Sequence, residues 1–446
     1  MQEKSITQFL SNEYKEFAFY TIENRAISSL IDGLKISQRK IINACLDIWK
    51  TGGEKNLKVF QLSGVVAHTQ FYHHGNTSLD SAIINLAQKF KNNVPLLEED
   101  GQFGSLRSPQ AGAPRYIGTK LSPKFRIIYK DFDLLEYKEE EGEKIEPQYF
   151  LPLIPMILVN GISGIAVGFA ANILSRDINE VIDFCIKYIK NGQITKLKPS
   201  LKEFKGTYIQ ESDKKWIVRG IFEKVNTSTI KISELPPSMT YERYENILDK
   251  LVEDKDIVSY EDNCKDSINY TIKFSRATLE SLNDDMIYKL LKLEEAETEN
   301  FNTLDEYGKL KSFDSAEEII EYFIKFRILK YNDRKKFQLE KLQNELLVLR
   351  NKGIFIKNIL ADKIIINSKS KEEIIEQIKS IPIDKHEDSY DYLLRMPIYT
   401  LTKEMFDKLK EDFINKKKDI ENLNNLDPKD IYLSELNDLR IKFKSN

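Results

Sequence analysis

The sequence is poor in cysteine and has no long apolar run. Its 446 residues include only three cysteines, Cys45, Cys185 and Cys264, which lie far apart and never at the C-x-x-C spacing. That scarcity argues against a disulfide framework or a zinc site and indicates a reducing compartment, which we expect to be the cytoplasm. No run of about 20 apolar residues occurs and the N-terminus lacks a signal-peptide core, so we expect neither a membrane span nor a signal peptide.

The sequence also lacks an excess of positive charge and the common phosphate-binding and metal-binding motifs. The formal net charge is −3, so bulk charge gives no indication of a nucleic-acid partner. Neither a glycine-rich phosphate loop nor an acidic triad for catalytic magnesium is present. The stretch Asp131-Phe132-Asp133 has the D-x-D form, but it lies in an acidic segment without strand context. We therefore predict that this chain alone holds no metal and no nucleotide.

What the sequence does contain is a shaped, basic stretch at residues 102–120, QFGSLRSPQAGAPRYIGTK. Its three glycines and two prolines predict a loop, and its charged residues are all basic. Tyr116 directly follows Arg115 in this loop. A phenol titrates near pH ~10 and attacks phosphorus only when neighbouring cations or a base assist it. On the dipeptide alone, an ordinary loop tyrosine beside an ordinary arginine is the favoured interpretation, because the chain has 21 tyrosines.

Local charge separates sharply around this loop. Residues 101–130 hold six basic residues and no acidic one, whereas residues 131–150 hold eight acidic residues and two lysines. This distribution favours a phosphate-facing surface beside a solvated acidic loop. Chance clustering of charge would look the same.

Two further segments carry candidate contacts for a phosphate backbone. Residues 7–50 read as two helices around a turn at Asp32-Gly33, with Ser37 as the expected N-cap of the second helix. The basic residues near this turn suit docking of a helix-turn-helix, or form a plain basic surface: Arg25, Lys35, Arg39 and Lys40. His73 and His74 precede a helix and could donate to a phosphate, or pack against the loop; no further ligand stands at zinc spacing.

Four stretches in one order carry a resemblance to a known family. They are NRAI…DGLK..QR (24–39), KVFQLSGVV…YHHG (58–75), GQFGS…APRYI (101–117) and NGISGIAVGFAANI (160–173). This series resembles the breakage-reunion part of type IIA DNA topoisomerases, in the form of the separate DNA-cleaving (medium) subunit of the T-even-phage type. Ser28 and Ile36 stand where the family often has proline, which affects the expected loop geometry but not the assignment of Tyr116.

The resemblance implies a role for each matching residue. Tyr116 would be the nucleophile that forms a 5′-phosphotyrosine, Arg115 would bind the scissile phosphate, and His74 would donate near the leaving 3′-oxygen. Fixed cations and a donor are what this transition state requires. Ile165 would insert between base pairs as a wedge. The other implied DNA contacts are Arg25, Lys35, Arg39 and Lys58.

The same resemblance implies an α+β multidomain fold. Residues 1–150 would form a winged-helix (CAP-like) DNA-cleavage domain with the catalytic tyrosine. Residues 151–312 would form an α/β tower domain, for which short β-like runs between 206 and 274 and a helix near 241–257 are independent indications. Residues 313–446 would form antiparallel coiled-coil arms with a helical C-terminal dimerisation gate. There, Ser315 begins a capping box and an apolar stripe runs to Gly353, while a second helix spans 401–423.

The implied function is ATP-dependent type II topoisomerase activity, with relaxation or decatenation of DNA by strand passage. Double-stranded DNA, a second copy of the chain and a separate ATPase/Toprim subunit would be the partners, and Mg²⁺ and ATP would be bound by that subunit. The place would be the cytoplasm, of an infected host cell if the gene belongs to a phage. A catalytically inactive coiled-coil DNA-bridging protein is the alternative. A tyrosine recombinase or relaxase fits less well, because no Arg-His-Arg cluster precedes a C-terminal tyrosine.

Overall fold

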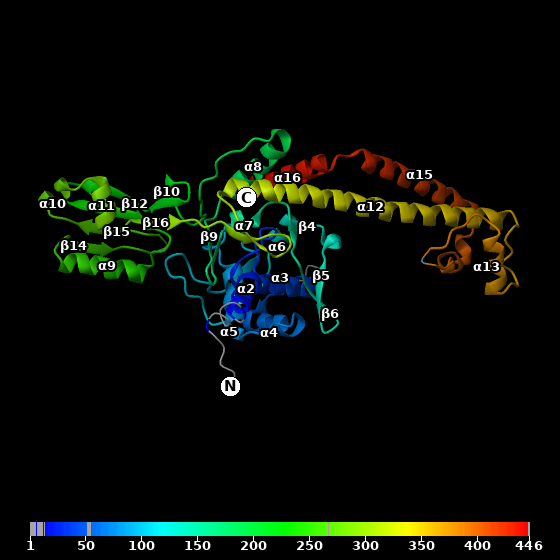
Figure 1. Ribbon diagram of the computed structural model, residues 1–446, viewed down its shortest axis with the longest axis horizontal. Coiled ribbons are helices and arrows are strands. Elements are labelled where there is room, and N and C mark those ends of the chain that lie inside the picture. The colour runs from blue at the N-terminus through cyan, green and yellow to red at the C-terminus, as the bar shows by residue number, and fades with distance from the viewer. Residues whose placement is uncertain are drawn as a thin grey trace. The chain divides into compact units, whose positions relative to one another are not determined.

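The computed structural model describes residues 6, 12, 14–50, 55–265, 267–386 and 388–444. Within the chain, contacts define two compact units, Met1–Arg327 with Leu433–Asn446, and Ile328–Tyr432. The helices and strands are drawn in Figure 1. In the described part of the chain, none of the helices combines the length and apolar character needed to cross a bilayer.

The first unit begins with helices packed on a small antiparallel sheet. The sheet has the order β1-β3-β2, so the strand that follows the Tyr116 loop lies in the middle. The predicted turn at Asp32-Gly33 is present, with Gly33 at a φ of +72°. The elements of this part are α2 (Lys15–Thr21), the π-helix η2 (Ile22–Ala26), α3 (Ile36–Ile48), β1 (Leu57–Lys58), α4 (Val59–Thr69), α5 (Asn76–Ala87), β2 (Leu97–Asp100) and β3 (Gly118–Leu121).

Helix α3 shows how the apolar pattern is used. Ile41, Ile42 and Cys45 share one face and are fully buried, as the helical spacing predicts. The predicted N-cap was wrong, because the helix begins at Ile36 and the side chain of Gln38 accepts from the backbone N–H of Lys35. The start of the predicted first helix of the pair, residues 7–11 and 13, lies outside the described residues, and its later part forms α2 and η2.

An aromatic core connects this part to the segment that follows. Phe125 and Tyr129 stack with ring centroids 4.3 Å apart, and Phe150 meets Phe125 edge-on at 5.6 Å. The hydroxyl of Tyr129 donates to the carbonyl oxygen of Asp32 in the turn at 2.9 Å. The elements here are α6 (Pro123–Ile128), β4 (Tyr129–Lys130), η3 (Phe132–Leu134), β5 (Tyr137–Glu140), β6 (Glu143–Pro147), β7 (Leu151–Pro152), α7 (Met156–Val159), β8 (Ile162–Ile165), β9 (Ala170–Ile173) and α8 (Ile178–Asn191).

The next part of the first unit is a mixed α/β region with its own core, drawn in green in Figure 1. One sheet has the order β10-β11-β16 and the other β12-β13-β15-β14, all antiparallel. Ile230, Ile232, Tyr270 and Ile272 form the centre of its core and are fully buried. This confirms the predicted mixture of short strands with a helix between them. The elements are β10 (Thr207–Ser212), β11 (Lys215–Arg219), β12 (Ile221–Asn226), β13 (Thr229–Glu234), α9 (Tyr241–Glu253), β14 (Ser259–Asp262), β15 (Tyr270–Lys273), α10 (Arg276–Ser281), α11 (Asp284–Leu290) and β16 (Glu294–Thr298).

A hairpin, β17 (Asn302–Leu304) and β18 (Leu310–Ser312), leads to the long helix α12 (Ala316–Leu360). Gly308 occupies the left-handed region at the hairpin tip with φ +75°, a conformation that glycine adopts without steric cost. The backbone N–H of Glu318 donates to Ser315 Oγ at 3.3 Å, so the predicted start of α12 is confirmed. The predicted end was wrong: α12 continues through Gly353, because Phe355 and Ile356 behind it are buried.

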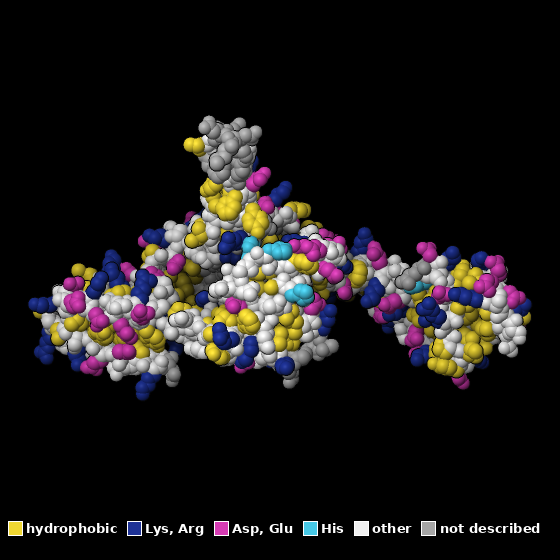
Figure 2. Space-filling view, turned by 90° about the horizontal axis from the view of Figure 1, so that it is seen from below, with side chains coloured by type: hydrophobic (Ala, Val, Ile, Leu, Met, Phe, Trp, Pro, Cys, Tyr) yellow, Lys and Arg dark blue, Asp and Glu magenta, His cyan; other side chains and the backbone are white. Residues whose placement is uncertain are grey.

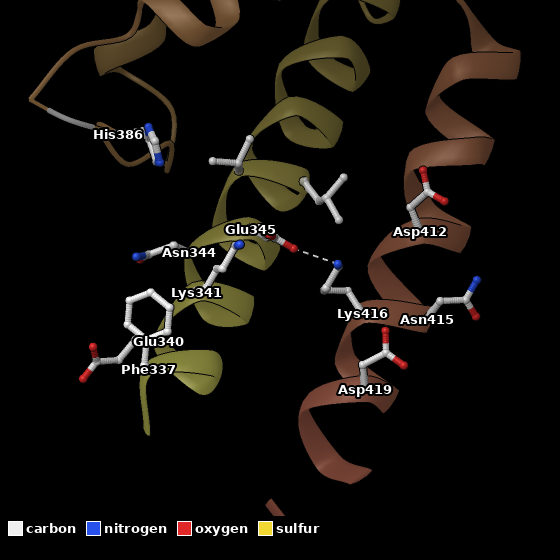
Figure 3. A pocket seen from close by; sticks show the side chains of 12 residues that line it. Phe337, Glu340, Lys341, Asn344, Glu345, His386, Asp412, Asn415, Lys416 and Asp419 are labelled. Atoms are coloured by element: carbon white, nitrogen blue, oxygen red, sulfur yellow. Dashed lines mark hydrogen bonds and ion pairs between the residues drawn. The ribbon is translucent and has the colours of Figure 1, made fainter. Parts of the chain in front are cut away.

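The second unit is built from α12 and the returning helix α15 (Lys403–Asn425), with a small head between them. Lys335 donates to the carbonyl oxygens of Asn424 and Leu426, and Glu345 pairs with Lys416 at 2.7 Å, so the two helices are antiparallel. Figure 3 shows this last pair in a cavity of about 800 Å³ between the helices. The head contains α13 (Lys371–Lys379), α14 (Asp391–Leu394) and η4 (Ile398–Thr400) around its own apolar core.

The last helix, α16 (Pro428–Lys444), returns the chain to the first unit. Where the second unit begins and ends, Tyr331 of α12 stacks on Tyr432 of α16 with ring centroids 4.7 Å apart. Both rings are fully buried. The two ends of this unit therefore lie next to each other.

Candidate functional site

Tyr116 lies at the end of the 102–117 loop and presents its side chain to solvent. It is 72% exposed. Its backbone, in contrast, is fixed, because the carbonyl oxygen of Tyr116 accepts from Lys58 Nζ at 2.8 Å and its N–H donates to the carbonyl oxygen of Ala113 at 2.9 Å. The phenol is therefore accessible to a macromolecular substrate while the main chain that carries it is held in place.

The body of the loop is folded on itself rather than extended. Gly104 has a φ of +85°, and a Cβ there would lie 2.8 Å from the carbonyl group of Pro109. The buried amide of Gln88 donates to the carbonyl oxygens of Phe103 and Pro109, one on each arm of the loop. The N–H of Gly112 also donates to the carbonyl oxygen of Gln102 at 2.8 Å. This network defines one path for the chain between β2 and β3.

Next to Tyr116, Arg115 is exposed, so its guanidinium is available to an anion. Lys58 is exposed too, but its ammonium group is already bonded to the backbone of Tyr116. Lys58 thus shapes the loop, and its free donor positions remain accessible. These three residues form one group of the predicted site, brought together by β1 and the loop.

Several of the other predicted residues lie around a separate cleft of about 620 Å³. Arg25, Lys35, His73 and His74 line it, whereas Arg115 and Tyr116 do not. His74 Nε2 lies 3.4 Å from the hydroxyl of Tyr20, and His73 Nε2 lies 2.8 Å from a carboxylate oxygen of Glu140. Figure 2 shows histidine, basic and acidic side chains gathered on one face of the molecule. The structure therefore divides the predicted site residues into two groups.

Lys35 is held at the edge of this cleft. Its ammonium group donates to the carbonyl oxygen of Ser163 in β8 at 3.1 Å. Burial of the side chain lowers the pKa of Lys35 below its ordinary value. Lys35 thus ties the turn before α3 to the β8–β9 hairpin and still borders the cleft.

Arg39 is the predicted site residue that the structure contradicts. It is 4% exposed, and its guanidinium donates to both carboxylate oxygens of Asp32 at 2.7 and 3.1 Å. A side chain in this position cannot reach a phosphate on the surface, so the prediction of direct DNA contact by Arg39 was wrong. The pair instead stabilises the turn, because Asp32 also accepts from the backbone N–H groups of Leu34 and Phe150.

The predicted basic surface over residues 101–130 needs a similar correction. Arg107 is 7% exposed and paired with Glu234, far along the sequence. Arg126 donates to the carbonyl oxygen of Trp49, and Lys120 pairs with Glu98 at 3.2 Å. Arg115 and Arg126 are exposed, whereas Arg107 is buried and Lys120 is half-buried in its ion pair, so the sequence run does not form one continuous phosphate-facing surface.

Ile165 stands at the tip of the β8–β9 hairpin and is 86% exposed. The hairpin itself is seated tightly, since a Cβ on Gly164 would lie only 2.1 Å from the carbonyl oxygen of Ala26. The side-chain amide of Asn302 donates to the carbonyl oxygen of Ala170 on the other strand. An apolar side chain on a fixed, projecting hairpin is the geometry expected of a wedge between stacked bases.

Comparison with known proteins decides the family. The sequence model that describes the A subunits of DNA gyrase and topoisomerase IV matches residues 25–438, which is most of the chain. The chain belongs to this family. It is 30% identical to the DNA topoisomerase medium subunit of Enterobacteria phage T4, over 99% of this chain and 100% of that protein. The resemblance predicted from the four motifs is confirmed.

Longer members of the topoisomerase family show the same similarity over a part of their length. The chain is 32% identical to DNA topoisomerase 2 of Plasmodium falciparum and 34% identical to the mitochondrial DNA topoisomerase 2 of Dictyostelium discoideum, over 99% of this chain in both cases. It spans 35% of the length of each of these relatives. The crystal structure of the Plasmodium falciparum topoisomerase II DNA-binding, cleavage and re-ligation domain matches with a TM-score of 0.84 and 32% identity, over 98% of this chain and 64% of that one.

Metal ligands are not gathered anywhere in the described ranges, where no group of three or more His, Cys, Asp or Glu side chains is placed to hold an ion. Within the Asp131-Phe132-Asp133 stretch, Asp131 forms a buried ion pair with Arg327 and thus has a structural role. Sequence reasoning missed Gln88, and it assigned Arg107 to the phosphate-facing surface although Arg107 is a buried tie of the loop. Neither carried a local signal, because each acts on carbonyl oxygens or a carboxylate brought near only by the fold.

Proposed function

We propose that this chain is the DNA-cleaving and rejoining subunit of an ATP-dependent type II DNA topoisomerase. The observation that carries the proposal is the exposed phenol of Tyr116 on a loop with a fixed backbone, directly beside the exposed Arg115. A nucleophile that must attack a DNA strand has to be both accessible and held in place. The enzyme would make a transient double-strand break and pass a second duplex through it, giving relaxation or decatenation.

The proposed step is a transesterification. Tyr116 gives its proton to solvent water and its oxygen attacks a backbone phosphorus, so that an Oη–P bond forms while the bond from phosphorus to the 3′-oxygen breaks. The products are a 5′-phosphotyrosine and a 3′-hydroxyl. Because His74 lines the separate cleft, which Tyr116 does not line, we assign the proton of this hydroxyl to the His74 side chain of the second copy of the chain. Arg115 stabilises the negative charge on the phosphoryl oxygens. Rejoining reverses these bond changes and needs no high-energy donor, because the phosphodiester energy is kept in the tyrosyl link.

DNA binding is assigned to two groups of residues. Arg25 and Lys58 offer exposed cations to the backbone, and Lys35 contributes charge from the edge of the cleft. Ile165 would unstack one base step and bend the duplex, at a cost of a few kcal/mol that wider contact offsets. Arg39 acts indirectly, by stabilising the turn that carries Lys35.

We assign three domains on this basis. Residues 1–150 would be a winged-helix DNA-cleavage domain, supported by the helices α3 to α5 and the three-stranded sheet with the Tyr116 loop before its central strand. Residues 151–312 would be the tower domain, supported by the two antiparallel sheets. Residues 313–446 would be the coiled-coil arms and the dimerisation gate, supported by the antiparallel α12 and α15 with their head.

The proposal needs a partner for the remaining chemistry. The name of the phage T4 relative, a medium subunit, indicates that this relative acts beside other subunits. We infer that a separate ATPase/Toprim subunit binds ATP and the Mg²⁺ that would neutralise charge at the scissile phosphate, and that two copies of this chain act on one duplex. The cytoplasm, of an infected cell if the gene is from a phage, is the expected location.

The proposal is tested by trapping the covalent complex. The chain is mixed with its ATPase/Toprim partner, Mg²⁺ and supercoiled DNA, denatured, and digested to find the residue attached to DNA. We expect Tyr116 on a 5′ end, and loss of the covalent product by about 10³-fold or more in Tyr116→Phe. Tyr307→Phe, which alters another highly exposed tyrosine, is the matched control and should cleave normally. DNA binding without any covalent product would support the alternative of an inactive DNA-bridging protein.

A further inference from the structure

We propose that Arg107 is a positioning residue for the cleavage reaction. It locks the loop that carries Tyr116 onto the segment that follows β13, so that the nucleophile is held from two sides of the first unit. This inference rests on the proposed function, because it takes Tyr116 as the nucleophile.

The contacts of Arg107 all lead to one short segment. Its Nη1 atom donates to the carbonyl oxygens of Pro236 and Met239 at 2.6 and 2.8 Å. Its Nη2 atom donates to the carboxylate of Glu234 and to the carbonyl oxygen of Leu235. Both charged side chains are 7% exposed. Arg107 is thus a buried fork that gathers the chain between β13 and α9 around its guanidinium.

Arg107 occupies the tip of a tight turn in the loop. Ser105 and Ser108 on either side exchange backbone hydrogen bonds, each N–H donating to the other's carbonyl oxygen at 2.9 and 3.2 Å. The carbonyl oxygen of Arg107 accepts in addition from the N–H of Tyr241 at the start of α9. The tip therefore cannot shift without moving residues 234–241 as well.

The other anchors of the loop lie on a different part of the first unit. Gln88 follows α5 and holds Phe103 and Pro109, while Lys58 of β1 holds the carbonyl oxygen of Tyr116. The loop is consequently suspended between the helical part near the N-terminus and the sheet region after residue 206. Arg107 is the side chain that makes the second attachment.

A fork of this kind is specific to arginine. Its planar group presents several donors in fixed directions, so that each of the two terminal nitrogens of Arg107 bonds two oxygens. A single lysine ammonium cannot make these four bonds. Loss of the fork leaves the loop attached mainly at one side and lets the Tyr116 oxygen drift from the in-line position. A misplacement of about 1 Å costs on the order of 10²-fold in rate. The loss should fall on the chemical step and not on DNA affinity, because Arg107 is buried and its donors are bonded within the chain.

The test measures cleavage and binding separately in the full chain with its ATPase/Toprim partner. For Arg107→Ala we expect the single-turnover rate of covalent complex formation at saturating DNA to fall by about 10–100-fold. The dissociation constant for a short duplex should stay within about twofold of wild type, since no phosphate contact is removed. Arg107→Lys should show a similar loss, because charge without the fork does not restore the geometry.

Arg219→Ala is the matched control. Like Arg107, Arg219 bonds several acceptors through its guanidinium, here the carboxylates of Glu294 and Asp285, but both partners belong to the sheet region and not to the 102–117 loop. It should cleave within about threefold of wild type even if its melting temperature falls as far as that of the Arg107 variants. If Arg107→Ala does not fold, the cleavage rate of Arg107→Lys, whose side chain fills a similar space, is compared with wild type instead.

Three results would overturn the inference. These are near-wild-type cleavage by both Arg107 variants, a loss of DNA affinity that accounts for the loss of cleavage, or an equal loss in Arg219→Ala. In each case wild-type cleavage through Tyr116 would leave the proposed function intact. Absence of a Tyr116–DNA link in the wild type would instead remove the proposed function, and this inference with it.

Discussion

Three arginines near the proposed site differ in what surrounds their guanidinium groups. Arg115 is exposed, whereas Arg39 and Arg107 are buried against Asp32 and Glu234. An exposed guanidinium is available to bind a phosphate. A buried guanidinium stabilises the fold through its ion pair, and removing either partner leaves an unpaired buried charge and lowers the free energy of unfolding. At the residue scale, the difference between binding DNA and supporting the site that binds it is therefore a difference in burial.

Asp32→Ala tests the buried tie directly. The substitution leaves the guanidinium of Arg39 and the N–H groups of Leu34 and Phe150 without their acceptor. We expect the free energy of unfolding to fall by about 3–5 kcal/mol, as for other broken buried pairs. Denaturant unfolding followed by circular dichroism measures this. Asp314→Ala, which removes an exposed pair with Lys214, should cost less than about 1 kcal/mol; equal losses in the two variants would contradict the distinction.

The exposed members of the site could be predicted from the sequence and the buried ones could not. Tyr116, Arg115 and Arg25 are exposed as their motifs suggest, and Ile165 projects from its hairpin. Arg39 looks like one more surface cation because its partner is fixed only once the Asp32 turn closes. Arg107 is less predictable still, since Glu234 is 127 residues away in sequence. The spacing of residues in the sequence indicates local structure. Burial depends also on segments that are distant in the sequence, and residue spacing gives no information about those.

At the scale of elements, local signals indicate correctly where several structures begin. Ser315 caps α12, Asp32-Gly33 makes a turn, and Tyr307-Gly308 closes a hairpin. The same reasoning fails for the end of α12, because Gly353 resembles a stop signal. Packing of Phe355 and Ile356 in the second unit outweighs the low helix propensity of one glycine.

Gly353→Ala should accordingly stabilise the protein. Gly353 lies in the interior of a 45-residue helix, and an added Cβ would meet no atom within 4 Å. We expect the free energy of unfolding to rise by about 0.5–1 kcal/mol, because alanine loses less backbone entropy than glycine on entering a helix. Thermal unfolding of the two proteins measures it. Gly104→Ala is the opposite case and should destabilise, since its φ of +85° and the nearby Pro109 carbonyl leave no room.

At the scale of the whole molecule, the head of the second unit exposes apolar side chains with no partner in this chain's described part. Ile398 and Tyr399 in η4 are each 81% exposed. Adjacent apolar residues at such exposure are typical of an interface, and we interpret this one as the contact with a second copy.

Substituting this pair should weaken self-association. In Ile398→Asp/Tyr399→Asp we expect the dissociation constant of the dimer to rise by about 30-fold or more, because buried aromatic anchors each contribute about 2 kcal/mol or more at interfaces. Sedimentation velocity over a range of concentrations measures the change. Ile414→Asp on α15, at an exposed apolar position outside the head, should leave the dimer unchanged; a normal dimer in the double variant would place the contact elsewhere.

The stacked pair of Tyr331 and Tyr432 has a consequence for how this molecule can be re-engineered. The second unit begins and ends at neighbouring positions, because Tyr331 and Tyr432 are in contact. The residues between these two tyrosines can therefore be treated as an insertion at one point of the fold. Shortening, lengthening or exchanging that insertion would leave the route of the chain on both sides unaltered.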